Sequence, residues 1–383
     1  MKGAAVLNKK VIVKSLTAEN FLSLDKIKVD FGKLTILVGP NASGKSNIIK
    51  ALTLLSGIGR EKSNTEIQTI CKKHLRVESL RQVFYDLRED VTLRLNLEAD
   101  GQNILYRISF NSDGIINKEE VVREKSLLTR TAADAVSYMN KEGRVKSQLP
   151  LHSSFVPAIT QISERKDSHF IVKRMKSILA NIRAYAFEAD RIKSEASSGF
   201  NLNLSRDGSN LAQALHSLLT YERKSFLEIE DIMKQLIPEI EEINVPTTKN
   251  GQRVYLSIKE KGIPKPLKYH NISDGTLRIL AFVTALYLEN TIIAFEEPEN
   301  CVHPYLFETV VDLCRKSPTQ VVMTTHSPYL LNKVSDPKEV LLVEKENGRT
   351  KVKPVEDLNK ARRLLEEGIP LGEIWYMGEL QEK

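Results

Sequence analysis

The stretch GPNASGKSN at residues 39–47 has the residue types and the spacing that bind a chain of phosphates. Glycine residues let backbone N–H groups turn toward phosphate oxygens, because no Cβ atom stands in the way. Lys45 can place a positive charge on the β- and γ-phosphates, and the Ser46 hydroxyl is a ligand for Mg²⁺. The stretch fits the pattern G-x-x-x-x-G-K-[ST] and predicts a bound nucleoside triphosphate. The predicted phosphate-binding residues are Gly39, Pro40, Asn41, Ala42, Ser43, Gly44, Lys45, Ser46 and Asn47.

Glu296 and Glu297 form a second candidate group in the segment TIIAFEEPEN. An apolar run that ends in two carboxylates indicates a buried strand with its acids at the carboxyl edge of a sheet, where open α/β sheets bind ligands. Glu296 can then hold the Mg²⁺ shell, and Glu297 can take a proton from an attacking water. The competing interpretation is an ordinary strand end with solvated acids, which is common.

Two further motifs lie at the start of a helix and at the end of a strand. In NISDGTLRIL, Ser273 is a candidate N-cap before an apolar helix, and such a helix start, with Gly275 beside it, is a second anion site. In VVMTTHSPYLL, His326 follows an apolar strand and can contact the terminal phosphate. Taken alone, the first is an ordinary capped helix and the second a structural histidine, so their weight comes from their order along the chain.

Strands and helices must position these motifs, and the apolar patterns predict where they lie. The run KLTILVG predicts a buried strand before the phosphate loop, and SNIIKALTLL predicts a helix after it. The continuous apolar runs TIIAFEE and QVVMTTH are typical of parallel strands. Alternation between residues 90 and 123 predicts an antiparallel sheet, and EVLLVEKENGRTKVKPV predicts a closing hairpin with an NG turn.

These patterns divide the chain into three parts. Residues 1–123 are expected to form an N-terminal lobe with the phosphate loop and an antiparallel sheet. Residues 124–240 are expected to be a mainly helical insertion, and residues 241–383 a C-terminal lobe with the remaining motifs. The expected fold class is α/β, with a mostly parallel core sheet, a flanking antiparallel β-subdomain and the helical insertion.

The composition is that of an ordinary globular protein with a basic balance. The chain has 383 residues, a net charge of +7 and a pI near 9.0. This charge is compatible with DNA as a partner and equally with an ordinary basic surface. The three cysteines lack metal-ligand spacing and indicate a reducing compartment with buried thiols. No apolar run is long enough for a signal peptide or a membrane span, so we expect a cytoplasmic protein without a membrane partner.

In this order, the motifs resemble the ATP-binding-cassette (ABC) ATPases of the SMC/RecF branch. They are more closely similar to the OLD-like and AAA_21-type single-head ATPases of DNA metabolism and phage defence. The matching stretches are GPNASGKSN, SDGTLR, FEEPENCVHP, TTHSPYLL and LGEIWYMGEL, within residues 10–60 and 200–380. The resemblance implies an ABC-type P-loop ATPase head that binds ATP and Mg²⁺ and hydrolyses ATP slowly.

The resemblance also implies a role for each matching residue. Ser46 and Glu296, at the Walker B position, would be the Mg²⁺ ligands. Glu297 would be the general base and His326 the switch histidine. The glutamine that such heads place in their Q-loop is not evident, and Gln82 is only a candidate.

The segment ISDGT takes the place of the ABC signature. Ser273 and Gly275 would reach the γ-phosphate of a partner subunit's ATP, so that two heads close as a homodimer around two ATP molecules. Asp274 departs from the usual signature. Its negative charge beside a γ-phosphate is unfavourable unless it points away or is paired.

Two functions are compatible with these motifs. The first is an ATPase that acts on DNA in repair or defence, with basic clusters such as KRMK at 173–176 and ADRIK at 189–193 as the contact. The second is an ATP-gated switch that licenses a separate effector, such as a nuclease, without touching DNA. An end at residue 383 leaves no room for the TOPRIM nuclease of full OLD proteins, which favours the second. A transporter motor is disfavoured, because FEEPENCVHP and SDGTLR are not transporter-like.

Overall fold

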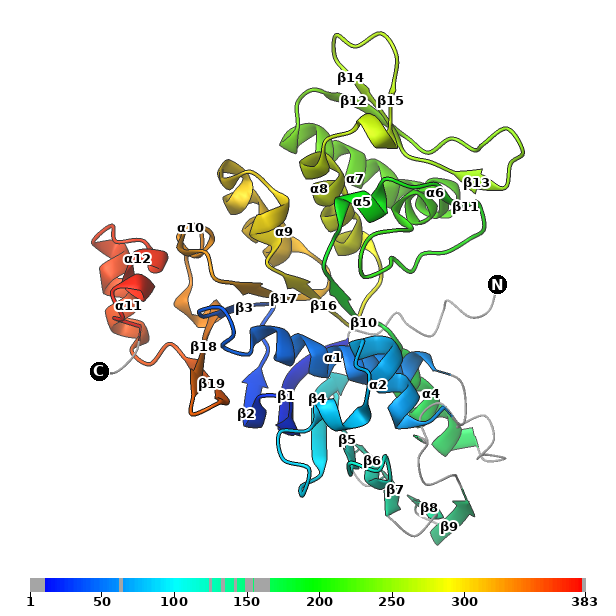
Figure 1. The fold of residues 1–383 in the computed structure, drawn as a ribbon, viewed down its shortest axis with the longest axis vertical. Coiled ribbons are helices and arrows are strands. Elements are labelled where there is room, and N and C mark those ends of the chain that lie inside the picture. The colour runs from blue at the N-terminus through cyan, green and yellow to red at the C-terminus, as the bar shows by residue number, and fades with distance from the viewer. Residues whose placement is uncertain are drawn as a thin grey trace. The chain divides into compact units, whose positions relative to one another are not determined.

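A computed structural model describes residues 11–61, 65–123, 126–131, 135–140, 143–148, 154 and 166–380. The chain divides into two compact units, whose elements are labelled in Figure 1. Unit 1 comprises Met1–Arg183, Asn290–Ile292 and Val340–Pro354, and unit 2 comprises Ala184–Glu289, Ile293–Glu339 and Val355–Lys383. Each unit contains both helices and strands, which confirms the predicted α/β class.

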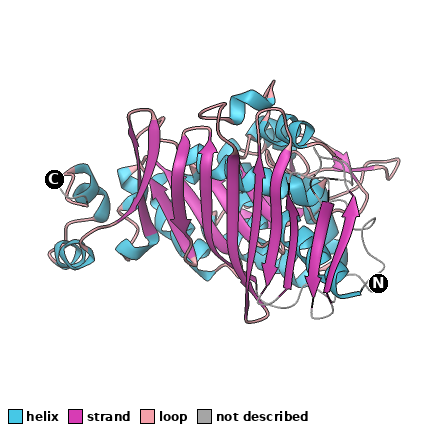
Figure 2. Cartoon of the chain, turned by 90° about the horizontal axis from the view of Figure 1, so that it is seen from below, coloured by secondary structure: helices cyan, strands magenta, loops and turns pink. Residues whose placement is uncertain are grey.

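An eight-stranded antiparallel sheet is the largest part of unit 1. Its strands are β1 (Val11–Phe21), β2 (Leu24–Asp30), β4 (Val91–Ala99), β5 (Gln102–Phe110), β6 (Ile116–Arg123), β7 (Ser126–Thr131), β8 (Ala135–Asn140) and β9 (Gly143–Gln148). They follow the order β2-β1-β4-β5-β6-β7-β8-β9, and Figure 2 shows the strands side by side. Ala18 of β1 lies opposite Ile27 of β2 and Leu93 of β4. The antiparallel strands predicted between residues 90 and 123 are confirmed, and β7–β9 extend the sheet into a region where helices were expected.

The phosphate loop of unit 1 follows a short buried strand. This strand, β3 (Leu34–Val38), pairs in parallel with β18 (Val340–Glu346), which pairs in turn with the antiparallel β19 (Arg349–Pro354). The β18–β19 turn contains Asn347 and Gly348 with φ of 50° and 81°, as an NG hairpin turn requires. The predicted strand before the loop and the predicted hairpin are both confirmed.

The helix that follows the phosphate loop packs against other helices of unit 1. Helix α1 (Lys45–Arg60) contacts α2 (Ile67–Leu75) and α4 (Lys166–Ala180), and a 3₁₀ turn, η2 (Leu80–Val83), follows α2. The apolar face predicted for α1 is buried, with Ile48, Ile49 and Leu52 inaccessible to solvent. Burial of each such side chain stabilises the fold by about 1.5–3 kcal/mol. This packing fixes the helix whose first turn carries Lys45.

Unit 2 contains the strands that end in the candidate acids. Strands β16 (Ile292–Glu296) and β17 (Gln320–Thr325) are neighbours in one sheet, with β10 (Ile182–Tyr185) beside β16. A smaller sheet has the order β12-β14-β15, from β12 (Ile240–Asn244), β14 (Ser257–Glu260) and β15 (Leu267–Lys268), and β11 (Ala196–Ser197) pairs with β13 (Arg253–Val254). Both β16 and β17 are buried almost throughout, as predicted for continuous apolar runs.

Unit 2 also contains helices. The predicted apolar helix is α8 (Asp274–Tyr287), and its interior residues are buried. Residues 211–236 form two helices instead of one, because the chain leaves helical geometry at Glu222. The helices of unit 2 are α5 (Ala189–Ile192), α6 (Leu211–Tyr221), α7 (Arg223–Leu236), α8, α9 (Phe307–Lys316), α10 (Pro328–Leu331), α11 (Leu358–Glu366) and α12 (Leu371–Tyr376), with 3₁₀ turns η3 (Tyr269–Asn271), η4 (Pro298–Cys301), η5 (Pro304–Leu306) and η6 (Pro337–Glu339).

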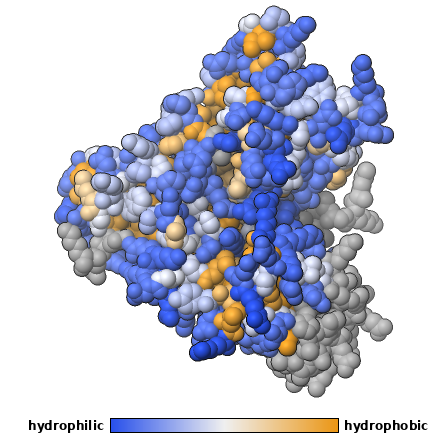
Figure 3. All heavy atoms as spheres, viewed as in Figure 1, coloured by the Kyte–Doolittle hydropathy of each residue, from blue (hydrophilic) through white to orange (hydrophobic). Residues whose placement is uncertain are grey.

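The surface and the thiols agree with the composition. Figure 3 shows a mainly hydrophilic face with scattered apolar spots. Among the described residues, no helix combines the length and the apolar character needed to span a membrane. Cys71 and Cys314 are free and buried, and burial raises the pKa of the Cys71 thiol to about 12. The side chain of Cys301 lies outside the described residues.

Candidate functional site

The phosphate loop lies between β3 and α1 with Lys45 folded over it. The Lys45 ammonium donates hydrogen bonds to the carbonyl oxygens of Gly39 at 2.7 Å and Pro40 at 2.9 Å. Only 5% of Lys45 is exposed, whereas the Ser46 side chain at the next position is exposed. The strand, loop and helix therefore have the geometry that the motif requires, with the cation held at the loop.

The hairpin β18–β19 anchors the loop from behind. Thr350 of β19 donates a 2.9 Å hydrogen bond to the Ser43 carbonyl, and its hydroxyl lies 2.6 Å from the Ser23 hydroxyl. The Asn47 amide donates to the same Ser23 oxygen at 2.8 Å. Ser23 and Thr350 were not predicted from the sequence, because only pairing of distant segments brings them to the loop.

Two glycines of the loop, Gly39 and Gly44, have no room for a side chain, and only Gly44 also has a left-handed backbone. Its φ is 107°, in the left-handed region, and a Cβ atom placed on it would lie 2.0 Å from the Thr350 hydroxyl oxygen. A side chain there must displace Thr350 and break the anchor of the loop.

Replacing Gly44 with alanine is therefore expected to weaken nucleotide binding and lower the melting temperature. The left-handed backbone costs an alanine about 1–2 kcal/mol, and displacing Thr350 adds about 1–3 kcal/mol of overpacking. Gly101→Ala is the matched control, because Gly101 has φ of 74° but a Cβ atom placed on it would meet no described atom within 4 Å. Titration with a fluorescent ATP analogue and thermal unfolding measure both effects. Unchanged nucleotide affinity in Gly44→Ala would show that the close approach of Thr350 is unimportant.

Glu297 and His326 meet at the ends of neighbouring strands in unit 2. The His326 Nδ1 atom lies 3.0 Å from Glu297 Oε1, and the Asn300 amide donates to Glu297 Oε2 at 3.1 Å. The Glu297 side chain keeps 33% of its surface exposed, so solvent reaches the carboxylate. Both oxygens have a partner, which orients the carboxylate.

The backbone at Glu297 is unusual for a glutamate. Its φ and ψ are 46° and 59°, a left-handed conformation that costs about 1–3 kcal/mol in a non-glycine residue. The Glu297 N–H donates to the Thr324 carbonyl at 3.1 Å, and Pro298 follows directly. Such strain is typical of functional sites, and here it turns the side chain at the strand end.

Glu299 is a third carboxyl group near this pair that sequence analysis did not single out. Its Oε1 accepts a 2.5 Å hydrogen bond from the Thr325 hydroxyl. Burial raises the pKa of Glu299 above its ordinary value, and the negative charge of Glu297 acts in the same direction. Its position three residues after Glu296 in EEPE was the available signal, but spacing alone does not show burial.

Glu296 ends β16 and is paired with a residue that the motifs did not indicate. The Arg206 guanidinium donates a short hydrogen bond to Glu296 Oε1. Arg206 lies in the segment before α6, in the part of the chain expected to be mainly helical. The carboxylate remains partly exposed, at 21% of its side-chain surface.

The start of α8 is capped as predicted. Ser273 Oγ accepts a 3.1 Å hydrogen bond from the Thr276 N–H. Asp274 is paired with Lys193, whose Nζ lies 2.6 Å from Asp274 Oδ1. This hydrogen bond holds the pKa of Asp274 below its ordinary value. The negative charge of Asp274, which was expected to be unfavourable beside a γ-phosphate, is therefore paired with Lys193.

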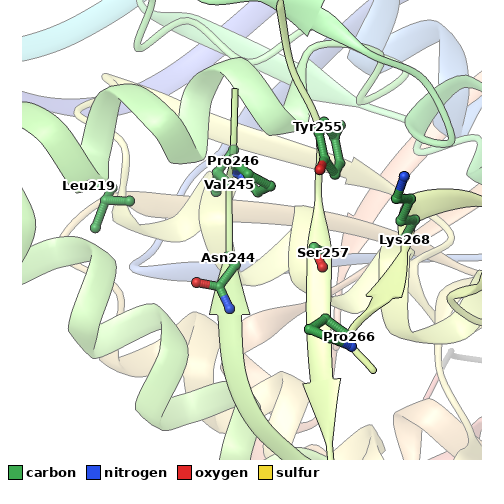
Figure 4. A pocket seen from close by; sticks show the side chains of 8 residues that line it. All are labelled: Leu219, Asn244, Val245, Pro246, Tyr255, Ser257, Pro266 and Lys268. Atoms are coloured by element: carbon green, nitrogen blue, oxygen red, sulfur yellow. The ribbon is translucent and has the colours of Figure 1, made fainter. Parts of the chain in front are cut away.

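The predicted residues fall into two groups, one in each unit. The phosphate loop belongs to unit 1, and Glu296, Glu297, His326 and the Ser273 helix start belong to unit 2. Gln82, the candidate Q-loop glutamine, lies in η2, and its side-chain oxygen accepts a hydrogen bond from the Glu78 N–H. A pocket of about 460 Å³ in unit 2 involves none of the predicted residues; Figure 4 shows its lining side chains Leu219, Asn244, Val245, Pro246, Tyr255, Ser257, Pro266 and Lys268.

Comparison with known families decides the assignment. Residues 34–332 match the family AAA_21, described as "AAA domain, putative AbiEii toxin, Type IV TA system". The chain belongs to the AAA_21 family. The matched range includes every site residue predicted above, from Gly39 to His326.

Two curated proteins are similar to this AAA_21 chain. An ATP/GTP phosphatase of Helicobacter pylori is 24% identical over 339 residues, which cover 82% of this chain and 85% of the phosphatase. The Old nuclease of Escherichia phage P2 is 24% identical over 393 residues, which cover 92% of this chain and 63% of the nuclease. The chain therefore spans less than two thirds of the nuclease's length.

Solved structures show which fold this AAA_21 chain has. An Smc head bound to the C-terminal winged-helix domain of ScpA matches with a TM-score of 0.61 at 14% identity, covering 91% of this chain and 99% of the head. An Smc head with an extended coiled coil, bound to a ScpA domain from Pyrococcus furiosus, matches with a TM-score of 0.54 at 14% identity, covering 93% and 99%. The fold is that of an SMC-type ABC ATPase head, as predicted, and the chain is an ATPase of this AAA_21 and SMC-head type.

The residues present in the AAA_21 chain fit Mg²⁺. Ser46 offers an exposed hydroxyl, and Glu296 offers a partly exposed carboxylate. Both are hard oxygen donors of the kind Mg²⁺ prefers, and Mg²⁺ commonly uses one or two protein ligands with phosphate and water supplying the rest. The described residues contain no group of three or more acidic, histidine or cysteine side chains that could hold a metal ion.

Proposed function

We propose that this AAA_21 protein is a Mg²⁺-dependent ATPase whose heads dimerise around ATP and that acts in DNA metabolism, in repair or phage defence. The observation that carries the proposal is the contact of 3.0 Å between Glu297 and His326, in a chain that also carries a complete phosphate loop. A carboxylate held by a histidine at a strand end, with solvent access, is suited to take a proton from water. Ordinary strand-end acids need no such partner.

In the proposed reaction, the loop residues and Lys45 bind the phosphates of ATP. Mg²⁺, held by Ser46 and Glu296, would neutralise charge on the phosphate oxygens. Glu297 takes a proton from the attacking water, and His326 and Asn300 keep its carboxylate oriented. His326 would contact the γ-phosphate and would lose this contact once the phosphate has left.

Dimerisation follows from the second anion site at the start of α8. The Ser273 hydroxyl is engaged in the cap. The first turn of any helix also has N–H groups without a partner inside the helix and a positive dipole end. A γ-phosphate held between this helix start and the phosphate loop of another subunit would favour the closed dimer, and its hydrolysis would release it.

DNA is the proposed partner because the chain has a basic net charge and because one of its relatives is named as a nuclease. Three cations of the predicted basic clusters are engaged within the protein, since Arg174 pairs with Asp100, Arg191 with Glu188 and Lys193 with Asp274. Binding would therefore rest on the remaining lysines and arginines and on phosphate contacts, which depend steeply on salt.

Size-exclusion chromatography with light scattering tests this proposal. The Glu297→Gln variant with ATP and Mg²⁺ is expected to elute as a dimer, and the same protein without nucleotide as a monomer. Duplex DNA is then added at about 50 and about 200 mM salt, where affinity falls about tenfold for every two phosphates neutralised. Dimerisation without DNA binding at low salt would favour the alternative, an ATP-gated switch that licenses a separate effector. A monomer at every nucleotide concentration would contradict the proposed dimer.

A further inference from the structure

One segment of unit 2 supplies a cation to each of the two acids that flank the proposed ATP chemistry. The segment runs from residue 186 to residue 209. Its Arg206 contacts Glu296 at the end of β16, and its Lys193 contacts Asp274 at the start of α8. The sequence indicated Lys193 only as part of the basic cluster at 189–193 and did not single out Arg206, and neither residue has a role in the reaction described above.

The two halves of this segment are joined to each other. The Ala186 N–H donates to the Arg206 carbonyl at 2.9 Å, and the Glu188 N–H donates to the Asp207 carbonyl at 3.1 Å. A Cβ atom on Gly208 would lie 2.8 Å from a side-chain carbon of Ile192, so the two halves also pack tightly. Arg206 and Lys193 are therefore carried by one connected piece of backbone.

The segment is also fixed to the elements that carry the acids. Tyr185 and Phe187 stack on each other and lie 5.8 and 6.2 Å from the ring of Phe295, the residue before Glu296. Helix α5, which ends one residue before Lys193, packs against α8 (Figure 1). This packing makes both ion pairs parts of a defined structure rather than chance contacts of surface side chains.

The contact of Arg206 is suited to orienting a carboxylate that must also serve a metal. One guanidinium nitrogen donates to Oε1 of Glu296, and within the described part of the chain Arg206 makes no second contact with Oε2. A charge-assisted hydrogen bond of this kind fixes the orientation of the carboxylate. Groups that hold a metal ligand in place commonly change metal affinity by about 10–100-fold when they are removed.

The contact of Lys193 concerns the negative charge of Asp274 in the segment ISDGT. Asp274 is 53% exposed and stands in the first turn of α8, where a phosphate would approach. Its carboxylate would repel that phosphate, and the Lys193 ammonium at 2.6 Å offsets the charge.

We propose that Arg206 and Lys193 are positioning residues of the two ATP half-sites. Arg206 orients Glu296 for the metal of the subunit's own ATP, and Lys193 neutralises Asp274 where the partner subunit's γ-phosphate docks. The inference rests on the proposed function, because the second half-site exists only in an ATP-bound dimer.

The role of Arg206 is tested by nucleotide affinity with and without the metal. Arg206→Gln is expected to weaken binding of a fluorescent ATP analogue in excess Mg²⁺ by about tenfold or more, and to leave binding in EDTA unchanged. Arg206→Lys should recover most of the loss, since a lysine can make the same single contact. Arg191→Gln is the matched control, because Arg191 lies on the same segment, is 67% exposed and pairs with Glu188 instead of either acid.

Equal losses with Mg²⁺ and with EDTA would overturn this role, because a general disturbance of the fold does not distinguish the two conditions. No loss in either condition would overturn it as well. Should Arg206→Gln fail to fold, Arg206→Met, which keeps the length of the side chain without its charge, is measured in the same way, and the same two outcomes decide.

The role of Lys193 is tested by a double-mutant cycle with Asp274. In the Glu297→Gln background, Lys193→Gln is expected to weaken the ATP-dependent dimer by about tenfold, since an unpaired carboxylate then faces the phosphate. Asp274→Asn should leave the dimer intact, and the double variant should dimerise within about threefold of the background protein. Light scattering over a range of protein concentrations gives the dissociation constants.

A double variant as weak as Lys193→Gln would overturn the charge-neutralising role, because removing the carboxylate would then not remove the defect. Wild-type dimerisation in Lys193→Gln would do the same. If the Glu297→Gln protein itself stays monomeric with ATP, the proposed dimer fails and the Lys193 role fails with it. The Mg²⁺ dependence of Arg206→Gln is measured on monomers and still decides the Arg206 role independently.

Discussion

Replacing Lys45 with alanine is expected to abolish ATP binding. Lys45 is only 5% exposed in the loop region, and its ammonium already lies within 2.9 Å of two loop carbonyl oxygens. The variant loses the only side-chain cation of the loop sequence, at the point where the phosphate charge concentrates. Truncating one partner of a buried charge pair costs about 2–5 kcal/mol, so affinity should fall by about 30-fold to about 4,000-fold. Isothermal titration calorimetry with ATP and Mg²⁺ measures the loss.

A second lysine of the same helix provides the control. Lys50 lies five positions further along α1, outside the phosphate loop, and Lys50→Ala should bind ATP as the unchanged protein does. Thermal unfolding of both variants without nucleotide separates lost binding from lost folding. ATP affinity of Lys45→Ala within about threefold of the unchanged protein would contradict a phosphate-binding role for the loop.

The sequence was sufficient where neighbouring residues determine the structure. The strand, loop and helix around Gly44, the cap at Ser273 and the NG turn at Asn347 depend on contacts within a few residues, and all three are present. The contact between Glu297 and His326 depends on one further fact, that β16 and β17 are neighbours. Apolar runs that end in polar residues indicated that arrangement, since such strand ends collect at one sheet edge.

The remaining groups were missed because their partners are distant in the chain. Thr350 reaches Ser43 across 307 positions, and Arg206 reaches Glu296 across 90. A threonine in a hairpin and an arginine in a polar loop carry no local pattern that distinguishes them from ordinary surface residues. Strands β7–β9 were missed for a related reason, because short strands in a polar region show too few alternations to be separated from loops.

Replacing Glu297 with glutamine is expected to slow ATP hydrolysis by about 10²–10⁴-fold, the usual contribution of a general base. A glutamine has nearly the same shape and can keep contacts with His326 and Asn300, but its amide cannot take a proton from water. ATP affinity should therefore be retained, which separates this variant from Lys45→Ala. Phosphate release under saturating ATP measures turnover, and titration calorimetry measures binding.

Other glutamates of unit 2 provide the control and the alternatives for the Glu297→Gln result. Glu308→Gln on α9 is a matched control, because its side chain is 69% exposed and belongs to no part of the site. Undiminished turnover in Glu297→Gln would exclude Glu297 as the base. Glu299 would be a poor replacement, because burial raises its pKa and favours the protonated form that cannot accept a proton. Glu296 would then be the acid left to test, and its proposed role as a Mg²⁺ ligand predicts that Glu296→Gln reduces nucleotide binding in Mg²⁺ as well as turnover.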